Sequence, residues 1–215
     1  MTAAKRETSR MLTVMAAGTV WFALIGQMYI ALWGRWQTDA SLIGGLINFF
    51  SYFTVTTNTL VAVVLTCAVT ARDSCCKRFF LQPWVSSGIA VSIVVVGVSY
   101  SLLLRNVWNP QGFQWLVNEL LHDVMPIVFL LYWGACVPRA RLRWQHALVW
   151  AIYPVTYFVY AMIRGNVIGQ YQYPFIDVAK LGFGQVLINS LVILAGFMLF
   201  SFALIGFDHW RAKSQ

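Results

Sequence analysis

The sequence has little charge, and acidic residues are the scarcest. Of its 215 residues 10% are charged, with 7 Asp and Glu against 15 Lys and Arg, whereas soluble domains carry about 25% charged residues. Because 60% of the residues are hydrophobic, this shortage excludes both an ordinary soluble domain and a disordered protein. A Gly/Ser-rich linker, a low-complexity tract and an internal repeat are also missing. The composition therefore predicts a polytopic membrane protein with one domain, residues 1–215.

Six apolar stretches are long enough to cross a bilayer, which takes about 20 helical residues. They cover approximately residues 11–34, 46–70, 83–104, 114–136, 145–163 and 181–207. The connections between them are short, so neighbouring spans should run antiparallel. The first stretch has no Ala-x-Ala-like exit and is expected to remain as a helix rather than be cleaved as a signal peptide. The sequence thus predicts an all-α fold, a single bundle of six transmembrane helices.

The basic residues predict the orientation of these spans. With a cytoplasmic N-terminus, eleven of the fifteen Lys and Arg residues fall in cytoplasmic segments, and the outer segments hold Arg35, Arg105, Arg164 and Lys180. This is the bias of the positive-inside rule, and it places both termini in the cytoplasm of a protein in the cell membrane. It also accounts for the net charge of +8. No nucleic-acid partner is expected, because no basic patch is interleaved with stacking aromatics.

Cysteine and histidine are too few and too scattered for a metal site. The four cysteines lie toward the predicted cytoplasmic ends of the spans: Cys67, Cys75, Cys76 and Cys136. That side is reducing, so free thiols are expected, with acylation of Cys75 or Cys76 as an alternative. The adjacent pair lacks the two to four intervening residues of usual metal ligands. We therefore expect no metal and no other cofactor.

Polar side chains within the spans indicate where a site lies, because such groups are costly in lipid and usually face the bundle interior. They form a stripe on the second span and shorter sets on the fourth and sixth spans: Asn48, Ser51, Thr54 and Asn58; Asn118, Glu119, His122 and Asp123; Gln185 and Asn189. Thr54, His122 and Asn189 each lie eight residues below the outer end of their span, or roughly 12 Å. This predicts a polar cavity near the outer face. A loop containing Asp177 lies above it, and its rim is formed by Tyr100, Ser101, Arg105 and Arg164.

The residue types in this predicted cavity suit hydrolysis. A threonine hydroxyl is a nucleophile only when a base takes its proton, and neutral imidazole is such a base, so Thr54 and His122 could act as a pair. Glu119 could orient the imidazole, while the amides of Asn58 and Asn189 could donate to an oxyanion. Structural roles remain as alternatives. A threonine hydroxyl can bond to its own helix, and the amides can join helices.

Several segments resemble a known family. They are Asn48-Phe-Phe-Ser-Tyr-Phe-Thr-Val-Thr-Thr-Asn58, Leu121-His-Asp-Val-Met-Pro126, Tyr153-Pro-Val-Thr-Tyr157, Arg164-Gly165 and Tyr173-Pro-Phe-Ile-Asp-Val178. Together they resemble a bacterial six-transmembrane branch of the androgen-induced (FAR-17a-like) intramembrane threonine hydrolase family. The resemblance implies an enzyme that cleaves fatty acid esters of hydroxy fatty acids with a membrane-embedded threonine and histidine.

The resemblance assigns these roles to Thr54 and His122, with Pro126 after the histidine. Two departures stand out. The amide of Asn58 comes one residue late, which leaves Thr56 and Thr57 as alternative nucleophiles. Asp123 directly follows the histidine, where the family has an aromatic or small residue, and this leaves the substrate class open.

The leading hypothesis is therefore an intramembrane lipid ester hydrolase whose partner is a membrane lipid or fatty acid ester. The second is a small-solute or proton-coupled transporter in which Glu119, His122 and Asp123 relay protons or cations. The third is a non-catalytic membrane scaffold. The sequence carries no signal for an oligomeric state.

Overall fold

The computed structural model describes residues 3–139 and 141–213, and every regular element in them is a helix. The predicted all-α fold is therefore confirmed. The chain divides into two compact units, residues 1–138 and 139–215, which are described separately. Whether they form the single domain expected from the sequence stays a prediction.

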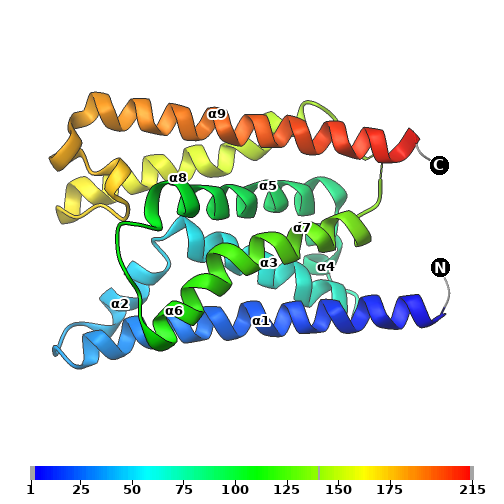
Figure 1. The fold of residues 1–215 in the computed structure, drawn as a ribbon, viewed down its shortest axis with the longest axis horizontal. Helices are drawn as coiled ribbons and strands as arrows, with labels where there is room; N and C mark the ends of the chain where they lie inside the picture. The colour runs from blue at the N-terminus through cyan, green and yellow to red at the C-terminus, as the bar shows by residue number, and fades with distance from the viewer. Residues whose placement is uncertain (1–2, 140, 214–215) are drawn as a thin grey trace. The chain divides into compact units, whose positions relative to one another are not determined.

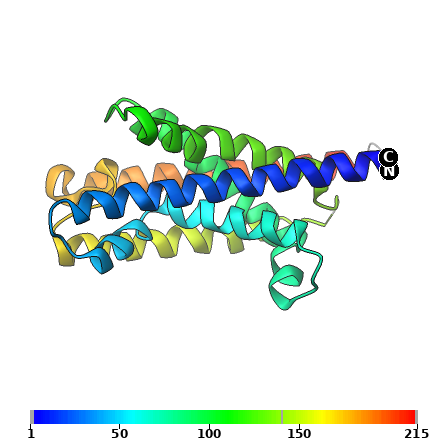
Figure 2. The same ribbon diagram turned by 90° about the horizontal axis from the view of Figure 1, so that it is seen from below.

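The first unit contains the larger set of helices (Figure 1). They are α1 (Ala3–Trp36), α2 (Leu42–Phe49), α3 (Phe53–Val69), α4 (Cys75–Phe80), α5 (Pro83–Ser99), η1 (Tyr100–Leu104), α6 (Gly112–Glu119), η2 (Leu120–Val124) and α7 (Met125–Cys136). Helix α3 packs against both α1 and α5, and α5 packs against α7. In Figures 1 and 2, α3 runs beside the long α1.

The core of the first unit lies between these helices and is filled by apolar side chains from each. Fully buried examples are Val20 of α1, Leu65 of α3, Ile93 of α5 and Phe129 of α7. Some polar side chains enter this core and bond across it, because polar groups away from water need partners. The indole of the buried Trp133, for example, donates to Ser87 Oγ at 2.7 Å. This hydrogen bond joins α5 to α7 within the core.

Five helices of the described chain are long and apolar enough to cross a membrane. They are Glu7–Trp36, Pro83–Leu104, Gly112–Cys136, His146–Ile168 and Val178–Lys213. A sixth span is present if α2 and α3 count together, although they are bent by 75°. The protein is thus an all-helical chain with five or six helices suited to a membrane, as its composition predicts.

The second predicted span, residues 46–70, is not one straight helix. Helix α2 ends at Phe49, and the two amides after Phe50 make the i→i−3 bonds of a turn, Ser51 N to Asn48 O at 3.1 Å and Tyr52 N to Phe49 O at 3.4 Å. Tyr52 is extended, with ψ 131°, and Phe53 begins α3. The expected single stripe is therefore divided, and Thr54 lies in the first turn of α3. Hydropathy could not reveal this break because the residues on both sides of it are equally apolar.

The second unit is a pair of long helices joined by a short connection. Helix α8 (His146–Ile168) packs against α9 (Val178–Lys213), with the 3-10 turn η3 (Pro174–Ile176) between them in sequence. The connection folds back tightly onto α8, since a Cβ atom on Gly165 would lie 2.2 Å from the Tyr171 ring. Gly182 adopts a left-handed φ of 75°, which interrupts the helical geometry near the start of α9.

Candidate functional site

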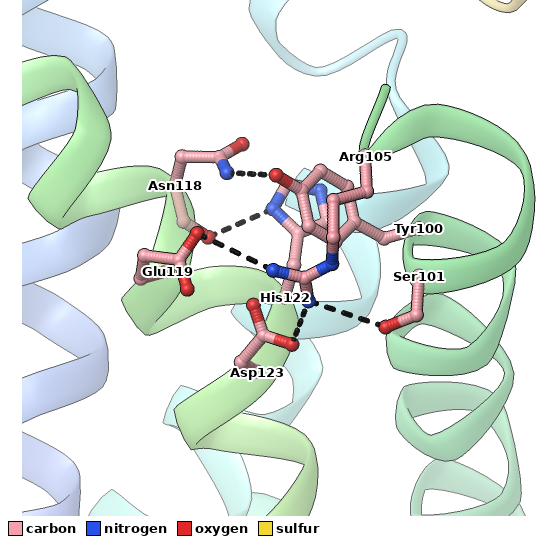
Figure 3. A network of polar contacts seen from close by, with 7 residues as sticks. All are labelled: Tyr100, Ser101, Arg105, Asn118, Glu119, His122 and Asp123. Atoms are coloured by element: carbon pink, nitrogen blue, oxygen red, sulfur yellow. Dashed lines mark hydrogen bonds and ion pairs between the residues drawn. The ribbon is translucent and has the colours of Figure 1, made fainter. Parts of the chain in front are cut away.

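Two short π-helical turns in the first unit carry Tyr100, Ser101, His122 and Asp123. Turn η1 ends the third span after α5, and η2 interrupts the fourth span between α6 and α7. Such turns are rare and often mark functional sites, because they redirect the side chains that follow. Figure 3 shows the polar network that these two turns bring together.

The backbone of η2 leaves one carbonyl without a helical donor. Met125 N–H bonds to Leu120 O, one residue further back than in an α-helix. The Leu121 carbonyl would next take the N–H of residue 126, but that residue is proline and has none. The Asn58 side chain from α3 supplies the missing donor, with Nδ2 at 3.2 Å from Leu121 O. This bond ties α3 to the residue that directly precedes His122.

The side-chain amide nitrogen of Asn58 makes two hydrogen bonds. Its Nδ2 also donates to Thr54 O at 2.9 Å, so both N–H bonds are engaged with backbone carbonyls. The oxyanion role expected of Asn58 therefore does not fit this geometry. The side chain is fully buried, and no hydrogen bond in the described residues reaches its Oδ1 atom. Asn58 thus connects the backbones of Thr54 and Leu121 and brings the two predicted catalytic segments to one place.

The His122 ring is oriented by Asn118. The ring Nδ1 lies 2.9 Å from the Asn118 carbonyl oxygen, one helical turn earlier. Because a carbonyl only accepts, this contact requires the hydrogen on Nδ1, and a neutral ring then has its lone pair on Nε2. No hydrogen bond of the described chain uses Nε2. The orienting role predicted for Glu119 stays a prediction; the contact that the ring makes is with the Asn118 backbone.

Tyr100 lies against the other side of the imidazole. The two rings are stacked with centroids 4.3 Å apart and an interplanar angle of 28°. The buried phenol oxygen accepts a hydrogen bond of 2.6 Å from Asn118 Nδ2. Asn118 therefore positions two rings at once, His122 through its backbone and Tyr100 through its side chain (Figure 3).

Arg105 forms the outer layer of this stack. Its guanidinium carbon lies 4.9 Å from the centre of the Tyr100 ring, and it makes a hydrogen-bonded ion pair with Asp123. It also approaches Glu119 Oε1 to 3.8 Å and donates to Ser101 Oγ at 3.3 Å. Glu119 and Asp123 thus face the arginine, and one cation is shared between two carboxylates. The sequence predicted Arg105 at the rim of the cavity but not its carboxylate partners, which are 14 and 18 residues away.

The three candidate threonines differ in their surroundings. Thr54 is 8% exposed in the first turn of α3, and its carbonyl accepts from Asn58. The Thr56 hydroxyl bonds back to its own helix, at 3.1 Å from Phe53 O, and Thr57 is fully buried. Thr54 is therefore the threonine that Asn58 links most directly to the His122 segment.

The remaining predicted residues belong to the second unit, where they have local contacts. Asp177 caps the start of α9, accepting from Ala179 N at 3.1 Å, and pairs with Lys180 at 3.5 Å. Asn189 Nδ2 donates to Phe175 O at 2.9 Å, and its Oδ1 accepts from Gln185 at the same distance. Arg164 lies on α8. Their expected place beside Thr54 and His122 stays a prediction.

Within the described ranges, no three His, Cys, Asp or Glu side chains lie close enough together to hold a metal ion. All four cysteines are free thiols.

Comparison with known proteins gives no relative: no family model, curated protein or solved structure matches the chain.

Proposed function

We propose that the protein is a multi-pass membrane hydrolase of the bacterial cell membrane that cleaves a lipid or fatty acid ester, with Thr54 as nucleophile and His122 as general base. In this proposal the chain crosses the membrane six times and both termini are cytoplasmic. The observation that carries it is the hydrogen bond from His122 Nδ1 to the Asn118 carbonyl. It leaves Nε2 as the basic nitrogen of a fixed ring, which is what an acyl-transfer base requires.

In the proposed reaction, Thr54 Oγ bonds to the ester carbonyl carbon while His122 Nε2 takes its proton. The carbonyl electron pair moves to oxygen and forms a tetrahedral oxyanion. As that intermediate collapses, the bond to the leaving alcohol breaks and His122 returns the proton to it. Water then attacks the acyl-Thr54 ester, with His122 again as base, and releases the acid.

Tyr100 is the proposed donor to the oxyanion. Its oxygen already accepts from Asn118, so its own hydrogen is directed elsewhere, and the stacked ring keeps the phenol beside the imidazole. A hydroxyl held in advance toward developing charge stabilises a transition state strongly. In this proposal Tyr100 takes the oxyanion role that the sequence predicted for the amides of Asn58 and Asn189.

Labelling with a fluorophosphonate probe tests this proposal. The purified protein should form a covalent adduct that mass spectrometry locates on Thr54. Thr54→Ala and His122→Ala should abolish the adduct, and Tyr100→Phe should slow its formation roughly 100-fold.

The matched control is Thr59→Ala, which removes a hydroxyl that bonds to its own helix at Val55 O. It should be labelled like the wild type, and all variants should keep the same helical circular dichroism. A label that survives Thr54→Ala, or that lies on Thr56 or Thr57, would contradict the assignment of Thr54.

A proton-coupled carrier is the second candidate, and the observation in its favour is the sharing of Arg105 between Glu119 and Asp123 at the fourth span. Ionisable groups within spans often relay protons or ions. Reconstituted vesicles separate the two functions. A carrier would move protons or solute without an ester present and would tolerate Thr54→Val, whereas the hydrolase would do neither.

A further inference from the structure

The segment that leads into α8 is fixed to the end of α9 by both backbone groups of one residue. Leu142 N donates to Asp208 Oδ2 at 3.4 Å, and Leu142 O accepts from His209 Nε2 at 2.8 Å. Leu142 is 4% exposed. Two consecutive residues of α9 therefore hold this segment in one place, 66 and 67 residues away in sequence.

The carboxylate in this contact is already neutralised. Asp208 Oδ1 accepts from Arg211 at 3.0 Å, and both side chains are buried, at 1% and 7% exposure. The second unit contains only one other acidic residue, Asp177, which lies at the opposite end of α9. Among the described residues of the second unit, Asp208 is thus the acidic side chain at this end of α9, and Arg211 already neutralises it.

Two such cations flank the fixed residue. Arg141 and Arg143 are exposed while Leu142 between them is buried, which is the alternation of an extended segment with both arginines turned outward. Neither arginine has an ion pair among the described residues. The surface thus presents two uncompensated guanidinium groups on a backbone that is held in place.

An indole lies directly beside them. Trp144 packs edge-on against His209, with ring centroids 5.5 Å apart, and it is still 53% exposed. Trp210 of α9 is 62% exposed. Exposed tryptophans near the end of a span are typical of the headgroup level of a bilayer. We call Arg141, Arg143 and Trp144 the basic platform.

We propose that the basic platform binds the phosphate headgroup of an anionic phospholipid. Guanidinium groups bind phosphate oxygens in pairs of parallel hydrogen bonds, and the indole would lie among the headgroups. The positive charge of a loop orients a membrane protein whatever conformation the loop adopts. Membrane orientation does not need the hydrogen bonds that Asp208 and His209 make to both backbone groups of Leu142. The buried Asp208–Arg211 pair is also a poor source of stability. A fixed spacing of two arginines is instead what a defined ligand needs.

Native mass spectrometry of the full chain in detergent tests this proposal. Phosphatidylglycerol and phosphatidylcholine of the same acyl composition are titrated against the protein. The wild type should bind phosphatidylglycerol more tightly. The double variant Arg141→Gln, Arg143→Gln should bind it at least tenfold more weakly, since each surface arginine contributes about fivefold.

The matched control removes the same charge elsewhere. Arg10→Gln, Arg72→Gln eliminates two exposed arginines on the predicted cytoplasmic side of the first unit and should change the affinity by less than twofold. An equal loss in both double variants would reduce the effect to net charge and overturn the proposal. So would a wild type that does not distinguish the two lipids.

Discussion

At the scale of single residues, Asn58 has the greatest structural consequence in the first unit. Its amide satisfies a carbonyl that Pro126 leaves without a donor and at the same time bonds to Thr54 O. A buried carbonyl that loses its partner keeps the full cost of desolvation, about 1–3 kcal/mol. Asn58 therefore stabilises the fold whatever reaction the site performs.

Replacing Asn58 by alanine should lower the free energy of unfolding by about 1–3 kcal/mol, because Leu121 O loses its donor. Thermal unfolding in detergent measures this loss. Asn106→Ala removes the same amide from an exposed position and should leave the unfolding temperature unchanged. Equal unfolding temperatures for the two variants would mean that Leu121 O obtains a donor elsewhere.

At the scale of elements, the close approach of α5 to the η2 and α7 segment depends on a glycine. A Cβ atom on Gly97 would lie 2.9 Å from His122 O and 3.0 Å from Pro126 Cγ. The backbone oxygen of the predicted base thus packs against α5. Tyr100, three residues after Gly97, depends on the same approach for its contact with the imidazole.

Gly97→Ala should therefore destabilise the protein by about 1–3 kcal/mol through overpacking and should also reduce fluorophosphonate labelling, because His122 shifts. Gly134→Ala is the matched control on α7, since a Cβ atom there meets nothing within 4 Å. It should be neutral or stabilising by up to about 1 kcal/mol, the difference in helix propensity. The same unfolding and labelling measurements apply to both variants, and a stable, fully labelled Gly97→Ala protein would contradict this account.

At the scale of the whole molecule, the distribution of positive charge is the main determinant of orientation. Most Lys and Arg residues fall in the segments predicted to be cytoplasmic, and the cost of moving such segments across a membrane opposes the inverted arrangement. The exposed thiols of Cys75 and Cys76 lie on that predicted side, whereas Asn106 follows the end of the third span that is predicted to face outward.

Membrane-impermeant maleimide distinguishes the two orientations. Native Cys75 and Cys76 should react only after the cells are permeabilised. In a chain whose four cysteines are serine, Asn106→Cys should react in intact cells. The reverse pattern would show that the protein is inserted with its termini outside.

The sequence by itself determined the class of the protein and most of its elements. Low charge and long apolar runs leave few folds other than membrane helices, because backbone groups in lipid must bond within their own segment. The predicted third span, residues 83–104, coincides with a helix of the structure. The cost of polar groups in lipid was enough to single out Asn58, Glu119, His122 and Asp123 as site residues from the sequence.

Only the tertiary structure decided which of these side chains meet. The bend between α2 and α3, the two π turns and the contact of Arg105 with Asp123 depend on neighbouring helices. Asn58 acquires its role because a proline on a different helix lacks an N–H group. Such contacts have no local periodicity, since they follow from how helices pack. For the same reason the sequence did not predict the two hydrogen bonds that Asp208 and His209 make to the Leu142 backbone.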